Sequence, residues 1–332
     1  MPATTTPLTK ILGALGLLAA ALALFTSCSN GDSVAEAAVE KDWVSLIDEE
    51  RAFTDLKNYV ELGPASHKRG NNDRLKKGRV FIKEGLRAAG IEDTRRQEWP
   101  QDITVGDAPR KVLMENIIGV LPGKRKDAVA IACHYDIKIL PRFVGANDGG
   151  SGVALTLELA RQLVKRAKGG WKPEFSYYFV FFDGEEAFVD WNEVGTDGHK
   201  DNTYGSRYLA ERLDEYPIKA LVLLDLVADA KLDITVDTSS TRALSEMFVE
   251  TGREVFGISK FGDAKDILDD HHPFMTKGVP AIDLIDFNYG TNNSYWHSPK
   301  DLVEHCSARS LAYVGTLVLS ALPKLSAWLL AR

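Results

Sequence analysis

The 332-residue sequence predicts an α/β fold, a three-layer sandwich in which a mixed, mainly parallel central sheet is flanked by helices. Two observations predict it. Apolar runs without polar alternation, such as residues 175–184 (FSYYFVFFDG), are typical of strands that are buried on both faces. These runs alternate with segments whose apolar residues recur at helical spacing, such as residues 151–167 (SGVALTLELARQLVKRA). No shift in composition divides this region, so we expect one domain over residues 41–332.

The elements expected from residue 41 onward begin with two helices. The first covers residues 41–62 and ends at Gly63-Pro64, and the second covers residues 73–89 and ends at Gly90. Beyond them, apolar runs predict strands and periodic segments predict helices. The strands are expected at 112–123, 127–136, 175–184, 219–227 and 279–287, and the helices at 151–167, 204–213, 241–256 and 307–330.

The first forty residues differ from the rest. Lys10 precedes an uncharged apolar run over residues 11–25, which is shorter than the ~20 residues of a spanning helix and indicates an export signal. The sequence FTSC, ending at Cys28, resembles a bacterial lipobox, although lipoboxes favour Leu at its first position. We therefore expect a lipoprotein signal over residues 1–28, membrane attachment through lipidated Cys28 and a flexible tether over 29–40. Plain secretion and an uncleaved anchor are the alternatives.

The overall composition is that of a globular protein, with 45% hydrophobic and 26% charged residues. The net charge of −7 argues against nucleic-acid binding, which needs a basic face. Besides Cys28, the chain has only Cys133 and Cys306, and we expect both to be buried free thiols. Export would also permit a disulfide between them. We expect a monomer.

Acidic residues and histidines follow the predicted apolar strands. In a largely parallel sheet, the carboxyl ends of the strands share one edge, where ligands bind. A collection of such side chains at one edge is typical of a metal site. The residues are His134, Asp136, Asp148, Glu185, Glu186, Asp225, Asp269, Asp270, His271, His272 and His297, the last preceded by Trp296.

The adjacent pair Glu185-Glu186 carries the most information. A second pair, Glu49-Glu50, lies in a predicted surface helix and is read as solvated. A buried strand delivers Glu185 and Glu186 instead, and unpaired buried carboxylates require a cation or a proton. A structural salt bridge is the alternative interpretation of this pair.

Other polar residues have structural interpretations. Asp148 lies in a glycine-rich loop, where it could be the N-cap of the helix over 151–167. His271 and His272 precede Pro273; we do not expect them to bind metal, and we expect one of them to pack or hydrogen-bond beside the site. The residues expected at the surface are His67 and His199 and, on the solvent side of an alternating strand, Asp233 and Asp237.

These motifs carry a resemblance to known enzymes. CHYD, ANDGGSG, FFDGEEAF, LLDL and a late WH occur in the order found in co-catalytic zinc aminopeptidases. DGEEAFVDW, YGSRYLA, LLDLV, DDHHPF, KGVPAIDLI and WHSPKD more closely resemble the glutaminyl cyclases, which share that fold. The resemblance covers roughly residues 43–330. The segments 192–203 and 288–295 are longer than is usual in the cyclases.

The resemblance implies a role for each motif residue. It also implies a cis peptide bond after Asp148. His134 matches a position that binds a second zinc in the aminopeptidases but not in the cyclases. The implied zinc ligands are Asp148, Glu186 and His297, the general base and acid is Glu185, the hydrogen-bonded acid pair beside the substrate amide is Asp225 with Asp269, and the pocket is shaped by Trp191 and Trp296.

The expected activity is the zinc-dependent cyclisation of the N-terminal glutamine of peptides or proteins to pyroglutamate, with release of ammonia. One zinc per chain would polarise the amide carbonyl, and Glu185 would shuttle the proton. The alternative is an aminopeptidase in which His134 and Asp225 bind a second zinc and share Asp148. An inactive zinc-binding lipoprotein is a third possibility, but such a protein should have lost ligands or the base, and all are present.

Overall fold

The computed structural model describes residues 42–63, 66–67, 73–105, 108–194 and 198–332. The predicted lipoprotein signal over 1–28, including Cys28, and the tether over 29–40 lie outside the described residues.

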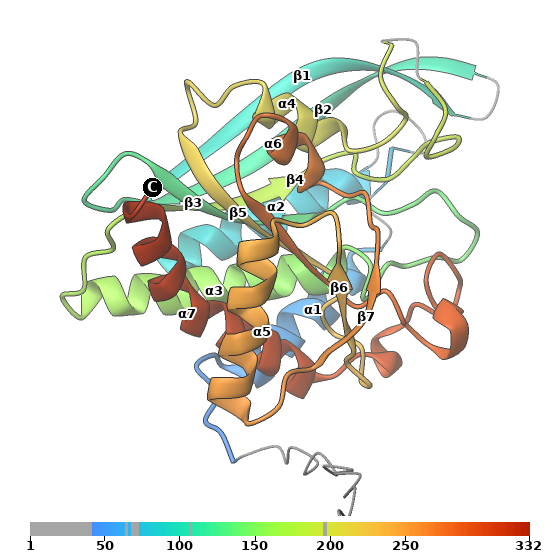
Figure 1. The fold of residues 1–332 in the computed structure, drawn as a ribbon. Helices are drawn as coiled ribbons and strands as arrows, with labels where there is room; N and C mark the ends of the chain where they lie inside the picture. Colours follow the sequence, from blue (N-terminus) through green and yellow to red (C-terminus); the bar gives the residue numbers. More distant parts are fainter. Residues whose placement is uncertain (1–41, 64–65, 68–72, 106–107, 195–197) are drawn as a thin grey trace, which may run out of the picture. The chain divides into compact units, whose positions relative to one another are not determined.

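A six-stranded mixed sheet forms the centre of the domain (Figure 1). Its strand order is β1-β2-β4-β3-β5-β8, in which β3, β4, β5 and β8 run parallel while β1 and β2 pair antiparallel. This arrangement confirms the predicted mixed, mainly parallel sheet. A separate two-stranded sheet pairs β6 with β7. The strands are β1 (Asp93–Val105), β2 (Ala108–Leu121), β3 (Ala128–His134), β4 (Ser176–Phe182), β5 (Ile218–Asp225), β6 (Ile234–Asp237), β7 (Phe261–Lys265) and β8 (Ala281–Ile285).

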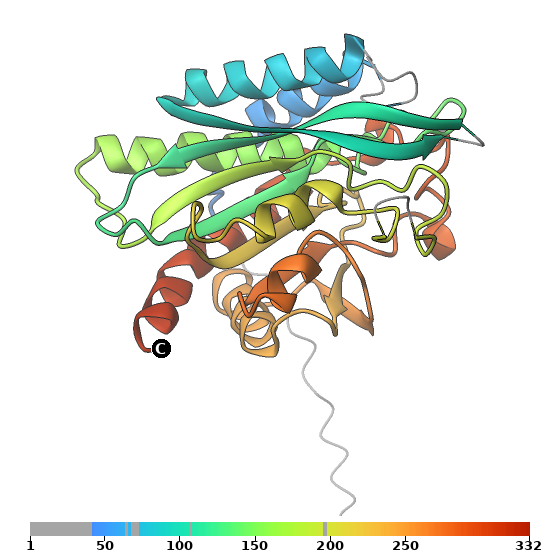
Figure 2. The ribbon, with the colours of Figure 1, turned by 90° about the horizontal axis from the view of Figure 1, so that it is seen from above.

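Helices cover both faces of the central sheet, which completes the predicted three layers (Figure 2). Phe179 and Phe181 of β4 face a core that includes residues of α1, α2, α3, α5 and α7, whereas Val180 and Phe182 face one beneath α4 and α6. Because successive side chains of a strand alternate between faces, both sets must be apolar. The helices are α1 (Glu49–Glu61), α2 (Asp73–Ala89), α3 (Gly150–Lys168), α4 (Tyr204–Ala210), α5 (Arg242–Phe256), α6 (His272–Thr276) and α7 (Ala308–Leu330), with 3-10 turns at Thr291–Asn293 and Val303–His305.

Several elements differ from the sequence-based expectation, in which β1, β7 and α6 are absent. Strand β1 has no apolar run; it is an edge strand on which buried and exposed residues mix, and Trp99 is its main anchor. Its position is fixed by a long antiparallel pairing with β2 rather than by its own composition. Helix α1 begins at Glu49 rather than at residue 41, because the Asp48 carboxylate accepts a hydrogen bond from the Arg51 amide and caps the helix there.

Helix α7 is long and apolar enough to cross a membrane by length and composition. Its buried residues, however, belong to the same core as those of α1, α3 and α5. Its hydropathy is therefore explained by its place inside the domain.

The two cysteines of the described domain are free thiols, as predicted. Cys133 lies at the end of β3 and is completely buried, and Cys306 is 8% exposed. Burial raises the pKa of the Cys133 thiol to about 12, so this side chain behaves as a small apolar core residue.

Candidate active site

The carboxyl ends of β3, β4 and β5 deliver side chains to one edge of the sheet. His134 is the last residue of β3, Glu185 and Glu186 follow β4, and Asp225 ends β5. The loops before α3 and after β8 add residues from the two sides. A pocket of about 470 Å³ opens there. Of the residues predicted for the site, it is lined by Asp148, Glu185, Glu186, Trp191, Asp225, Asp269, Trp296 and His297.

Asp148, Glu186 and His297 form a group that could hold a metal ion. Their ligand atoms lie within 4.8 Å of one another. Nε2 of His297 is 3.3 Å from Oδ2 of Asp148 and 3.1 Å from Oε1 of Glu186. The same Oδ2 of Asp148 is buried, and apart from the His297 ring it has no hydrogen-bond partner among the described residues, so a cation bound there would be stabilising. Two carboxylates and one imidazole suit zinc and leave a coordination position open, so the residues present fit the ion.

A second possible group shares Asp148. His134, Asp148 and Asp225 also place their ligand atoms within 4.8 Å of one another. Nε2 of His134 lies 3.4 Å from Oδ1 of Asp148 and 3.2 Å from Oδ1 of Asp225. Asp148 thus offers one oxygen to each group. The donor set is compatible with either one or two ions.

The pocket carries an excess of buried negative charge. Burial, followed by the charge of Glu186, raises the pKa of Glu185 well above its ordinary value. Burial and the charge of Asp225 raise the pKa of Asp269 to about 7. Burial alone would lower the pKa of His297, but the carboxylates of Glu186 and Asp148 raise it to about 9. The site therefore favours bound protons or a cation.

Asp136 holds the two glutamates in place. Its carboxylate accepts the backbone N–H groups of Glu185, at 3.1 Å, and Glu186, at 3.4 Å. Its backbone carbonyl lies 2.9 Å from Nδ1 of His134, so Nε2 of that ring is directed toward Asp148 and Asp225. Asp136 was noted in the sequence as a residue at a strand end, but its positioning role depends on contacts with a different strand.

Asp301 is a positioning residue that the sequence reading missed. It is completely buried and accepts the backbone N–H groups of Asn147, at 2.7 Å, and Asp148, at 3.1 Å. The hydroxyl of Tyr289 donates a third hydrogen bond at 3.0 Å. These bonds fix the loop that presents Asp148. Asp301 lies four residues after His297 in the motif WHSPKD, and this position was the feature of the sequence that could have indicated its role.

Lys138 and Trp296 complete the immediate surroundings of the ligand-type residues. Nζ of Lys138 lies 3.1 Å from Oε2 of Glu186, the oxygen that does not face His297. The ring of Trp296 stacks on the imidazole of His297 with 3.9 Å between centroids. His297 has a left-handed backbone, with φ of 48°. The ring contacts and the carboxylates together fix its orientation. Lys138 was not identified from the sequence.

His67 is not at the surface, so that prediction is wrong. It is 1% exposed, and its Nε2 lies 2.7 Å from Oδ1 of Asp183. Nη2 of Arg79 donates to the other oxygen of Asp183 at 2.6 Å. The three side chains form a buried cluster directly after the end of β4. Exposed His199 agrees with the prediction.

Asp237 is likewise buried rather than on the solvent side of its strand. Its Oδ2 lies 3.1 Å from Nε2 of His271 and accepts a hydrogen bond from the Ser240 hydroxyl at 2.6 Å. Asp233, predicted to be exposed, is partly buried. His271 therefore makes a polar contact as expected, and its ring nitrogen also lies within 4.8 Å of carboxylate oxygens of Asp237 and Asp283, a group that could hold a metal ion.

The loop at Asp148 contradicts one implication of the resemblance and one alternative interpretation. The cis bond implied after Asp148 is not found, because none of the peptide bonds among the described residues is cis. The N-cap position of α3 is Gly149, not Asp148, and no side chain caps this helix. Gly149 has φ of 86°, and this left-handed conformation turns the chain into α3 through a trans bond.

Sequence comparisons identify relatives over much of the chain. The profile of peptidase family M28 matches residues 116–322. The glutaminyl-peptide cyclotransferase of Drosophila melanogaster is 30% identical over 236 residues, which are 61% of this chain and 64% of that protein. The protein of that name from Bos taurus is 32% identical over 226 residues, 57% of this chain and 60% of its own. The chain thus spans less than two thirds of the length of these relatives.

A structural comparison agrees. The crystal structure of Acidobacteriales bacterium glutaminyl cyclase matches with a TM-score of 0.73 at 29% identity, over 86% of this chain and 97% of that chain. The family profile covers more than half of the sequence, including every ligand-type residue described above. The chain belongs to peptidase family M28.

Proposed function

We propose that this protein cyclises the N-terminal glutamine of peptides or proteins to pyroglutamate and releases ammonia. One observation carries the proposal. Glu185 and Glu186 are adjacent and buried at the end of β4, yet only Glu186 belongs to the ligand group around His297. Both residues line the same pocket, so Glu186 can bind the metal while Glu185 transfers a proton. The relatives named glutaminyl-peptide cyclotransferase support cyclisation as the reaction.

The residues support a simple proton path. The α-amine of the substrate attacks the carbon of its side-chain carboxamide, and its nitrogen must lose a proton as the new C–N bond forms. Glu185 would take this proton and return it to the amide nitrogen, which leaves as ammonia when the original C–N bond breaks. A zinc ion bound by Asp148, Glu186 and His297 would polarise the carboxamide carbonyl as a Lewis acid. The raised pKa of Glu185 suits a carboxyl group that accepts a proton and then donates it.

The acid pair would position the substrate. Asp225 and Asp269 line the pocket, and their pKa values are both raised by burial, in Asp269 to about 7. A protonated carboxyl can donate a hydrogen bond to the substrate amide, and an ionised one can accept from it. The hydrogen bond expected between the two carboxyls stays a prediction. Trp191 and Trp296 would form the apolar walls.

An aminopeptidase is the second candidate, favoured by the intact group of His134, Asp148 and Asp225. In that reaction a water molecule, deprotonated by Glu185, would attack the peptide bond. The two reactions require different substrates. The discriminating experiment follows ammonia release from a peptide that begins with Gln, beside hydrolysis of a peptide that begins with Leu. We expect the first reaction only; Leu hydrolysis without cyclisation would replace the assignment.

We also propose that the enzyme works outside the cytoplasm as a monomeric lipoprotein anchored through Cys28. The short apolar run followed by FTSC supports this location.

A further inference from the structure

A third group of side chains that could hold a metal ion consists of Asp237, His271 and Asp283. Their ligand atoms lie within 4.8 Å of one another. Asp237 ends β6, His271 immediately precedes α6, and Asp283 lies in the middle of β8. None of the three is among the residues that line the catalytic pocket. We refer to this group as the buried triad.

Asp283 is an acid inside an apolar strand. All five residues of β8, which reads AIDLI, are buried, and Asp283 is 1% exposed. Ala281, two residues earlier and therefore on the same face, belongs to the core beneath α4 and α6. Neither carboxylate oxygen of Asp283 has a hydrogen-bond partner among the described residues. A buried carboxylate in such a place is costly unless a cation or a proton neutralises it.

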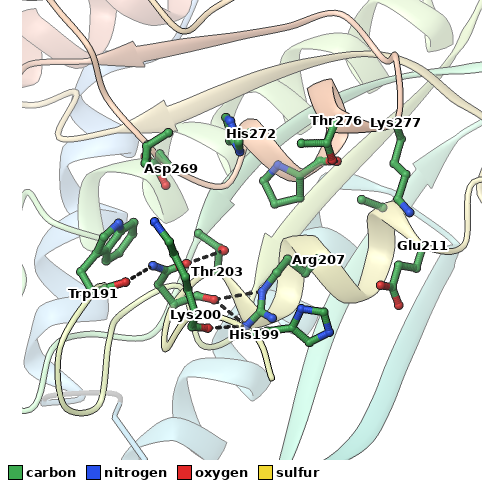
Figure 3. A pocket seen from close by; sticks show the side chains of 14 residues that line it. Trp191, His199, Lys200, Thr203, Arg207, Glu211, Asp269, His272, Thr276 and Lys277 are labelled. Carbon is green, nitrogen blue, oxygen red and sulfur yellow. Dashed lines mark hydrogen bonds between the residues drawn. The ribbon is translucent and has the colours of Figure 1, made fainter. Parts of the chain in front are cut away.

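The adjacent histidines His271 and His272 have different surroundings. His272 is exposed and lines a cavity of about 340 Å³, where Figure 3 shows it with Asp269. His271 is completely buried and does not line that cavity. Its Nε2 lies 3.1 Å from Oδ2 of Asp237 and 2.8 Å from Oγ of Ser239, whereas its Nδ1 has no hydrogen-bond partner among the described residues. The imidazole of His271 therefore keeps one unused nitrogen inside the domain.

Two serine hydroxyls adjoin the buried triad. Oγ of Ser240 donates to Oδ2 of Asp237 at 2.6 Å and accepts the backbone N–H of Asp283 at 2.9 Å. Oγ of Ser239 lies 2.9 Å from the same Oδ2. The triad thus combines two carboxylates and one imidazole with neighbouring hydroxyl oxygens. Its two carboxylates carry more negative charge than one imidazole can balance.

We propose that the buried triad binds a divalent transition-metal ion that is separate from the ion of the active site. Carboxylate and imidazole donors together suit ions such as Zn²⁺, Co²⁺ and Mn²⁺, whereas Ca²⁺ and Mg²⁺ are bound by oxygen ligands. The ion would join β6 of the two-stranded sheet, β8 of the central sheet and the start of α6. This role for His271 differs from the sequence-based expectation, and it does not depend on the proposed cyclase function.

The buried triad should hold its ion less tightly than the group of Asp148, Glu186 and His297. Oδ2 of Asp237 already accepts the Ser240 hydroxyl and lies at ion-pair distance from His271. An incoming ion must displace these contacts and any proton that His271 carries at the ligating nitrogen. We therefore expect dialysis against a weak chelator to empty the triad while the active-site zinc remains.

The test adds Co²⁺ to the zinc-loaded enzyme after that dialysis. Equilibrium dialysis measures bound cobalt, and zinc is measured in the same samples so that exchange at the active site is detected. We expect the wild-type protein to bind one cobalt per chain at the triad. His271→Ala and Asp283→Asn should each weaken this binding by more than about tenfold, because losing a ligand costs more than losing a group that only supports one.

Two further variants assign the cobalt to the triad. His272→Ala is the matched control, because it removes the exposed histidine next to His271 and should leave cobalt binding unchanged. His134→Ala disrupts the possible group of His134, Asp148 and Asp225. Cobalt that is bound at the triad should persist in this variant.

Thermal unfolding guards against variants that simply fold badly. Co²⁺ at about 100 times its Kd should raise the Tm of the wild-type protein by about 3–8 °C, because the ion binds only the folded state. Without the ion, Asp283→Asn should be no less stable than the wild type, since the amide removes a buried charge that lacks a partner. It should nevertheless lose the rise that the triad contributes.

Three results would overturn the proposal. The first is the absence of any cobalt beyond that exchanged for zinc, which would leave Asp283 as a protonated carboxyl. The second is cobalt binding that is equal in the wild type, His271→Ala and Asp283→Asn. The third is binding that is lost in His134→Ala or in His272→Ala. All three are independent of ammonia release from Gln peptides, so a failure of the cyclase assignment would be seen separately.

Discussion

Oε1 of Glu186 lies 3.1 Å from Nε2 of His297, although the two residues are 111 positions apart in the sequence. Glu185, the residue before Glu186, has no comparable contact with His297. It faces His134 instead, with 3.9 Å between Oε2 of Glu185 and Nδ1 of His134. Two adjacent carboxylates therefore have different neighbours. This difference is the structural basis for giving them different chemical roles.

The first prediction separates these roles. Glu186→Gln should weaken zinc binding, because an anionic ligand becomes a neutral amide. Glu185→Gln should retain zinc and lose about 10²–10⁴-fold in kcat, because an amide cannot shuttle a proton. Metal analysis of both purified variants, with ammonia release from a Gln peptide, checks this. Equal zinc loss in the two variants would contradict the division of roles.

The second prediction concerns the number of ions. We expect one zinc per chain, and His134→Ala should leave that zinc in place because His134 is not in the group of Asp148, Glu186 and His297. His297→Ala should lose it. The measurement is the metal content after dialysis against a weak chelator. Two tightly bound zincs in the wild-type protein, with activity lost together with the second, would favour the aminopeptidase.

The third prediction tests Asp301 as a positioning residue. Asp301→Ala removes the acceptor for the amides of Asn147 and Asp148 and should weaken zinc affinity about 10–100-fold, the usual effect of losing support around a ligand. Tyr289→Phe deletes only the third hydrogen bond and should have a smaller effect. Competition with a chelator of known affinity measures both. An unchanged zinc affinity in a folded Asp301→Ala protein would refute the role.

The fourth prediction concerns stability. Asp183→Asn leaves Arg79 and His67 without their buried carboxylate and should lower the free energy of unfolding by about 3–5 kcal/mol. Asp93→Asn is the control, because its pair with Arg95 is exposed to solvent and worth about 0–1 kcal/mol. Urea denaturation compares the two. A loss no larger than that of the control would show that the buried cluster is not stabilising.

The cluster of Asp183, His67 and Arg79 should also make the stability of the protein depend on pH. Burial alone would raise the pKa of Asp183, but His67 and Arg79 outweigh it and hold the pKa below its ordinary range. A lowered pKa in the folded state means that the stabilisation is complete above the unfolded-state pKa of about 4 and is lost as the pH falls through the folded-state value. The difference in stability between wild type and Asp183→Asn should therefore narrow below about pH 4.

The fifth prediction concerns attachment to the membrane. Cys28→Ser should release the protein into the soluble fraction, because the serine cannot receive the lipid. Cell fractionation and mass spectrometry of the mature N-terminus check this. A wild-type protein that is already soluble, or one without lipid at Cys28, would exclude the lipobox interpretation.

The sequence by itself determined the buried strands and the edge at which the site forms. Phe179 to Phe182 read as a strand buried on both faces, and the polar residues after it could then be placed at the carboxyl end of a parallel sheet. The rule that polar residues after parallel strands share one edge of the sheet predicts that Glu185, Glu186 and Asp225 lie close together, without any known contact between them. The rule can be applied from the sequence because a strand that is buried on both faces is a continuous run of apolar residues.

Only the tertiary structure decided which charged side chains are buried and paired. His67 and Asp183 are 116 residues apart, and the segment around His67 has no periodicity that marks it as interior. Asp237 lies in a strand whose alternation suggested exposure, until His271 and Ser240 are seen to cover it. The hydrogen bond that Asn202 donates to the backbone carbonyl of Trp191 likewise joins residues 11 positions apart. A polar residue can be buried wherever a distant partner satisfies its hydrogen bonds, and its own neighbours in sequence carry no record of that partner.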